Sequence, residues 1–199
     1  MESGKRPQRC YRTQAGLSSL PFALSIYAYH QFIEVMESIG RPVMSETITV
    51  DHTAEVLENV RAVAASAGMQ LHPHPSGKML MIKFNMGSSR SQTVFIEYSG
   101  RSAGGHDCIT FLSLCKVVKK ERILGGGLGK AQVLELLRRN ARLHFAHFAL
   151  ESFEGRNDVL MVKSSQLAAS METDEFKMHV ACVAHAADQF EQECGQDVF

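Results

Sequence analysis

Residues 79–86, MLMIKFNM, decide the fold because apolar side chains alternate along them. Alternate residues of a strand point to the same face of a sheet. The shared face here carries four apolar residues: Leu80, Ile82, Phe84 and Met86. After a turn over residues 87–90, the alternation returns at three further positions: Val94, Ile96 and Tyr98. The close spacing of the two stretches predicts an antiparallel hairpin.

Helical patterns lie before and after this hairpin. A helix is predicted after Asp51, with its end at Gly68 and an apolar stripe at Val56, Val60, Val63 and Ala67. A second helix follows the glycine-rich residues 125–129 and carries Val133, Leu134, Leu137 and Ala141. The last helix begins near Thr173, and its predicted buried stripe is Phe176, Val180, Val183, Ala187 and Phe190.

Three more strands complete the pattern. They are predicted at residues 108–118, 143–151 and 159–163, with a turn over 154–157 joining the last two. The order from residue 51 is therefore α-β-β-β-α-β-β-α. Because the strands cluster in hairpins, this order favours an α+β fold with an antiparallel sheet flanked by helices.

The first 43 residues differ from the rest and are predicted to be an N-terminal extension to a single domain over residues 44–199. Apolar residues recur at helical spacing within residues 17–36: Phe22, Ile26, Tyr29, Ile33 and Met36. We interpret this segment as an amphipathic helix, with peripheral membrane binding as an alternative. Polar residues interrupt it too often for a membrane span. From Met44 the sequence reads MSET, like an ordinary bacterial start, so residues 1–43 could also arise from the choice of start codon.

Composition excludes several classes of protein. The chain has 199 residues, of which 45% are hydrophobic, and its 21 basic residues balance 21 acidic ones. A net charge of zero argues against a nucleic-acid binder that works by neutralising phosphates. The five cysteines include no C-x-x-C pair, which favours a reducing, cytoplasmic setting.

The motifs that could carry chemistry are incomplete. The run Gly125–Lys130 resembles a phosphate-binding loop, but Ala131 stands where a hydroxyl should hold magnesium. His72 and His74 lie between prolines with no further metal ligand nearby, and we interpret them as an exposed loop. Two other pairs have poor spacing for binding one metal ion: His144 with His147, and His179 with His185. Ser88-Ser89, Ser164-Ser165 and Cys108 lie near turns and match no nucleophile motif. We therefore expect no enzyme, no metal ion and no cofactor.

The hairpin has one unusual property, which is that both of its faces are apolar. Met79, Met81 and Phe95 lie opposite the face that carries Leu80. An outer sheet face is normally polar, so these three residues imply a covering element, a dimer partner or an apolar binding surface. The N-terminal helix of the same chain is the first of these alternatives. Methionine suits adaptable binding surfaces, and the three residues are our candidate partner-binding site.

The order of elements and the run LLRRNARLHFAHFAL (136–150) resemble the type III secretion chaperone-like superfamily, including its YbjN-like branch. The resemblance covers about residues 46–193 and includes Asn140 at the end of the middle helix. It implies an α+β fold, frequently homodimeric, that binds protein segments or regulates and has no catalytic residues. Secretion chaperones are typically small and acidic, whereas this chain is neutral, which favours a regulatory or general chaperone-like role.

We therefore expect a non-enzymatic, dimeric protein-binding module that holds an apolar segment of a partner protein. The alternative is a domain that responds to a small molecule or nucleotide through the glycine-rich loop 125–130 and Lys130.

Overall fold

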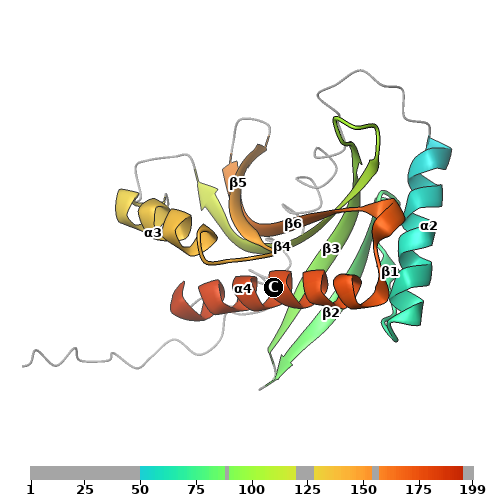
Figure 1. Ribbon diagram of the computed structural model, residues 1–199. Coiled ribbons are helices and arrows are strands. Elements are labelled where there is room, and N and C mark those ends of the chain that lie inside the picture. Colours follow the sequence, from blue (N-terminus) through green and yellow to red (C-terminus); the bar gives the residue numbers. More distant parts are fainter. Residues whose placement is uncertain (1–49, 88–89, 120–127, 154–156, 195–199) are drawn as a thin grey trace, which may run out of the picture.

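The computed structural model describes residues 50–87, 90–119, 128–153 and 157–194 (Figure 1). Within these ranges it has a six-stranded antiparallel sheet and three α-helices, which confirms the predicted α+β class. The helix predicted over residues 17–36 and the glycines at 125–127 lie outside the described residues. The described helices include none with the length and apolar character needed to cross a membrane.

The sheet is built around the predicted hairpin. Its strands lie in the order β1 (His72–Pro73), β2 (Met79–Gly87), β3 (Arg90–Arg101), β4 (Asp107–Lys119), β6 (Asn157–Leu167) and β5 (His147–Phe153). In the β2–β3 hairpin Leu80 pairs with Ile96 and Ile82 with Val94. The short strand β1 was not predicted. An edge strand tolerates Pro73, because proline needs no hydrogen-bond partner on the open side.

Helices α2 (Val50–Ser66) and α4 (Thr173–Cys194) pack against the sheet, and Figure 1 shows α4 running across it. The predicted stripe of α4 is confirmed, since all five of its residues are buried in the main core. Leu80, Ile82, Val94 and Ile96 belong to the same core. Helix α3 (Lys130–Asn140) contacts β5, at the end of the sheet farthest from β1.

Two of the differences from the predicted strand limits change where a candidate residue lies. Strand β5 begins at His147, because the turn that ends α3 holds Leu143, whose amide donates to the Arg139 carbonyl at 3.1 Å, and residues 144–145 form a bend. His144 therefore lies outside the strand on which we had placed it. Strand β6 continues to Leu167, so Ser164 and Ser165 are strand residues and not part of a turn.

A row of polar side chains fastens the C-terminal half of α4 to the sheet. Arg90 donates to the Asp188 carboxylate through Nε at 2.9 Å and through Nη2 at 2.6 Å. One turn further along, the Gln92 amide donates to Glu191 at 2.5 Å and accepts from the Ser113 hydroxyl at 3.0 Å. Buried polar groups are tolerated where they bond to one another, so this row fixes the position of α4 along β3.

A second polar network joins the N-terminal half of α4 to β6. The His179 ring contacts the Ser164 hydroxyl through Nδ1 at 2.6 Å and Gln166 through Nε2. The Gln166 amide in turn donates to Glu175 at 2.6 Å. The ring also stacks on Phe111 with the ring centres 5.2 Å apart. Burial lowers the pKa of His179 from its ordinary value, which favours the neutral ring.

Candidate functional site

Helix α3 turns most of its apolar side chains towards solvent. The exposed fractions are 39% for Val133, 43% for Leu134 and 60% for Leu137, while Leu136 is buried. Phe145 and Leu150, which lie just before β5 and within it, are about half exposed. These five residues, which we call the α3–β5 surface, are all but one of the exposed large apolar side chains in the described part of the chain. Val133, Leu134 and Leu137 share one short helix, and large apolar side chains are costly to leave in water, so the surface is a candidate interaction site.

Helix α3 is fastened to the sheet at its C-terminal end. The Asn140 side chain donates to the Phe148 carbonyl at 3.0 Å and accepts from the Phe148 amide at 2.7 Å. Arg139 is paired with Glu193 of α4, and this pairing raises the pKa of the guanidinium. An asparagine at the end of a helix commonly ends it through a left-handed backbone conformation. The structure instead uses its side chain to hold α3 against β5.

The same contact shows that β5 has an open edge. Phe148 turns its backbone amide and carbonyl away from β6 and towards Asn140. Backbone groups alternate along an antiparallel strand, so those of Leu150 point to the same side. Within the described ranges β5 is the last strand of the sheet on that side. An edge of this kind can pair with an added strand.

The surroundings of the α3–β5 surface are basic. Residues 130–142 contain four basic side chains and one acidic one, a net charge of +3. Arg138 and Arg142 have 71% of their side-chain area exposed, and Arg139 is held by Glu193. Arg138 and Arg142 both approach Glu135, at 3.9 and 3.4 Å, and the segment keeps a net positive charge that favours acidic groups in a partner.

The three residues predicted to bind a partner lie together on the other face of the sheet. Met79 and Phe95 belong to a second apolar cluster whose other members are Leu112, Leu114, Val159 and Met161, and Met81 packs against it. We call this the second face. Met79 and Phe95 are only 3% and 6% exposed, so they are not accessible to a partner in this structure. Of the alternatives that the sequence left open, their burial favours a covering element over an open binding surface.

Charged side chains border the cluster on the second face. The Lys163 ammonium donates to the Glu151 carboxylate at 2.5 Å, and both groups interact electrostatically with Glu97. Burial raises the pKa of Glu97 to about 7, although Lys163 acts in the opposite direction. Glu97 therefore titrates near neutral pH, unlike an ordinary glutamate.

The pKa of Glu97 predicts a pH dependence of stability. Because the folded-state pKa lies above the ordinary value of 4.5, the folded protein keeps this proton where the unfolded chain has lost it. The stabilisation is complete below pH 4.5 and is lost as the pH rises through about 7. Replacing Glu97 with glutamine should remove this loss, which is at most about 1.4 kcal/mol per pH unit.

Urea unfolding of both proteins between pH 4 and pH 8 measures the effect. The Glu97→Gln protein should gain stability relative to the original as the pH rises. Parallel stability profiles for the two proteins would show that Glu97 does not titrate in this range.

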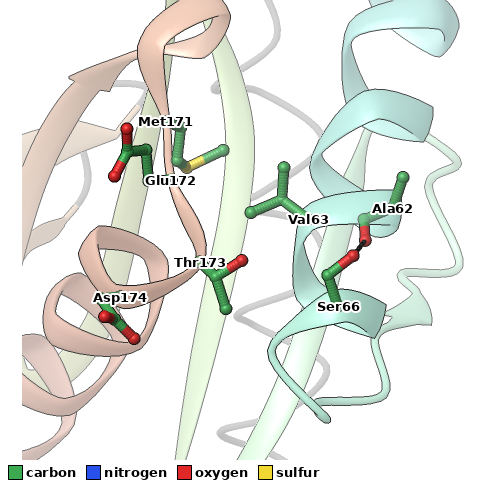
Figure 2. Close-up of a pocket in the computed structure, with 7 residues that line it drawn as sticks. All are labelled: Ala62, Val63, Ser66, Met171, Glu172, Thr173 and Asp174. Carbon is green, nitrogen blue, oxygen red and sulfur yellow. Dashed lines mark hydrogen bonds between the residues drawn. The ribbon is translucent and has the colours of Figure 1, made fainter.

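A cleft of about 490 Å³ lies between α2 and the start of α4 (Figure 2). It is lined by Val63 and Ser66 on one side and by Met171, Thr173 and Asp174 on the other. The Ser66 hydroxyl donates to a carbonyl of its own helix at 3.0 Å. The lining residues include two carboxylates, Glu172 and Asp174, and no basic side chain.

The other candidate residues that the sequence suggested take part in packing and hydrogen bonding within the fold. His74 is buried against Phe95, with its Nδ1 2.9 Å from the Ser76 hydroxyl, so our interpretation of an exposed loop was wrong for this residue. Ser164 is buried, and its hydroxyl lies within hydrogen-bond distance of both the Phe145 carbonyl and Nδ1 of His179, so it joins β6 to its neighbours. At the start of α3 the Gly129 amide donates to Gln132 at 3.1 Å, which occupies an amide that a phosphate would need.

Among the residues that the structure describes, no group of three metal-ligating side chains is close enough to hold an ion. The described cysteines are free thiols, and burial raises the pKa of Cys115 far above its ordinary value, which leaves that thiol unreactive. No protein-family model matches the chain, and a comparison with curated proteins finds no significant match.

Proposed function

We propose that this protein is a non-enzymatic binding module that holds an apolar segment of a partner protein on the α3–β5 surface. The observation that carries the proposal is the outward position of Val133, Leu134 and Leu137 on a helix that is otherwise firmly attached to the domain. A flexible apolar helix would be expected to fold back onto the core. Asn140 and Arg139 prevent this by holding α3 in place.

The charges around the surface select the chemistry of the partner. Arg138 and Arg142 are exposed and follow the exposed leucines in sequence, so the bound segment combines apolar residues with acidic residues at its flanks. Apolar contacts to Leu134 and Leu137 supply affinity, and Leu150 lies beside an open strand edge. A contact that buries roughly 1,200–2,000 Å² would be stable and specific.

The resemblance of residues 46–193 to the secretion chaperone-like superfamily supports the same class of function. Such a module would act in a reducing, cytoplasmic setting and without catalytic residues. A second copy of this chain could occupy the surface and form a homodimer, which the experiment below separates from partner binding. The loop 125–130 is not favoured as a nucleotide site, because Gln132 already accepts from the amide of Gly129.

A peptide selection tests the proposal. Peptides from a random phage-displayed library are selected in parallel on the original protein and on a protein carrying both Leu134→Glu and Leu137→Glu. The selected peptides should be apolar with acidic flanks, and the double variant should bind a synthetic one at least about tenfold more weakly. The two leucines are exposed, so unfolding free energy should change by less than about 1 kcal/mol.

Leu167→Glu is the matched control, because Leu167 is 39% exposed but lies at the end of β6. This variant should bind the synthetic peptide like the original protein. Light scattering should give the original protein and the double variant the same mass, because the homodimer expected from the sequence would then form through another surface. Equal enrichment of peptides on the double variant would contradict the proposal, as would binding only to anionic vesicles or a dimer that the double substitution dissociates.

A further inference from the structure

The second face is buried, although the described helices lie elsewhere. Met161 and Leu112, near its centre, are 0% and 1% exposed. In the described part of the chain, the apolar cluster on the second face contains only strand residues. The buried apolar residues of α2, α3 and α4 belong instead to the main core. A bare sheet face leaves its side chains in contact with water. The burial of this face therefore requires a covering element from outside the described ranges.

We propose that residues 17–36 of this chain cover the second face as an amphipathic helix. Apart from residues 1–49, the stretches outside the described ranges are 88–89, 120–127, 154–156 and 195–199, and none of these exceeds eight residues. Only residues 1–49 are long enough to cover six strands. This contact involves a different surface from the one proposed for partner binding, so it does not depend on that function.

The dimensions of the segment fit the sheet. A helix from Phe22 to Met36 is about 22 Å long. Six strands at their usual spacing extend roughly 24 Å from first to last. The apolar stripe along this helix can therefore contact most of the strands, and its side chains match a cluster rich in methionine and leucine.

The connection to α2 is also long enough. Helix α2 begins at Val50, and in its first turn His52 contacts Asp107 at 2.9 Å, at the start of β4. The ring of His52 also packs against Tyr98 on β3, with the ring centres 5.7 Å apart. The chain therefore enters α2 beside the end of the β3–β4 hairpin. From there residues 37–49 can extend over at most about 43 Å, which is enough to reach either face of the sheet.

Photocrosslinking in the full chain tests this inference. Tyr29 is replaced by p-benzoylphenylalanine, whose excited carbonyl inserts into nearby C–H bonds, including those of methionine. We expect a crosslink at monomer mass to peptides that contain Met79, Met81 or Met161. The matched control carries the same group at Gln31, which lies about 180° around the helix from the stripe and should not crosslink to the face.

Two outcomes would overturn the inference. Crosslinks at dimer mass would assign the cover to a second copy, and equal or absent crosslinking from the two positions would show that the stripe does not contact the face. A second pair of variants checks the result without the crosslinker. The double substitution Ile26→Glu and Ile33→Glu should increase deuterium uptake across residues 79–87, whereas Gln31→Glu should leave it unchanged.

Discussion

Replacing Arg90 with alanine is expected to lower the free energy of unfolding by about 3 kcal/mol. Only 9% of the Asp188 side chain is exposed, and Arg90 supplies two of its hydrogen bonds. Without Arg90 the Asp188 carboxylate would still accept a hydrogen bond from the Gln192 amide at 2.6 Å. No hydrogen-bonded cation would remain to compensate the negative charge of the carboxylate. An uncompensated buried charge is costly, so α4 should separate more easily from β3. Urea unfolding at pH 7 measures the loss.

The variant Asp188→Asn provides the control for this prediction. In that background there is no carboxylate to leave unpaired, so Arg90→Ala should cost only about 1 kcal/mol. The difference between the two backgrounds gives the coupling of the ion pair. An equal effect of Arg90→Ala in both backgrounds would show that the pair does not hold α4 in place.

Replacing His179 with alanine is expected to cost about 3 kcal/mol. The change removes the ring stacked on Phe111 and leaves a cavity between α4 and the sheet. It also removes a hydrogen-bond partner from both Ser164 and Gln166. Thermal and urea unfolding measure the loss, which should be a large fraction of the stability of a domain of this size.

His185→Ala is the matched control on the same helix, because His185 is exposed and contacts only the edge of Phe84 among described rings. Its cost should stay within about 0.5 kcal/mol. Equal losses for the two variants would contradict a structural role for the His179 network. A folded His179→Ala protein that lost peptide binding without losing stability would also contradict it.

The repeating patterns of the sequence predicted the elements with strong periodicity. The stripe of α4 and the hairpin of β2 and β3 follow directly from helical and strand spacing. The limits of β5 could not be predicted, because residues 143–146 are apolar enough for a strand, but Leu143 is held in the turn that ends α3 and residues 144–145 form a bend. Short edge strands such as β1 carry too few residues for any periodic pattern to emerge.

The interactions that define the candidate site depend on long-range packing. Arg139 and Glu193 are 54 positions apart, and no local pattern pairs them. The spacing of Val133, Leu134 and Leu137 predicts an amphipathic helix but not which side faces water, since that depends on where Asn140 and Arg139 attach it. The opposite faces of the hairpin were predictable, whereas the burial of Met79 and Phe95 depends on what lies over them.

Hydroxyl-radical footprinting tests the central claim most directly, because it reads the accessibility of both surfaces in one sample. In the free protein, Leu134, Leu137 and Leu150 should be oxidised rapidly, while Met79 and Met161 should react slowly. Adding the selected peptide should protect the three leucines and leave the two methionines unchanged. Rapid oxidation of Met79 and Met161 in the free protein, followed by their protection on binding, would place the partner on the second face and contradict the account.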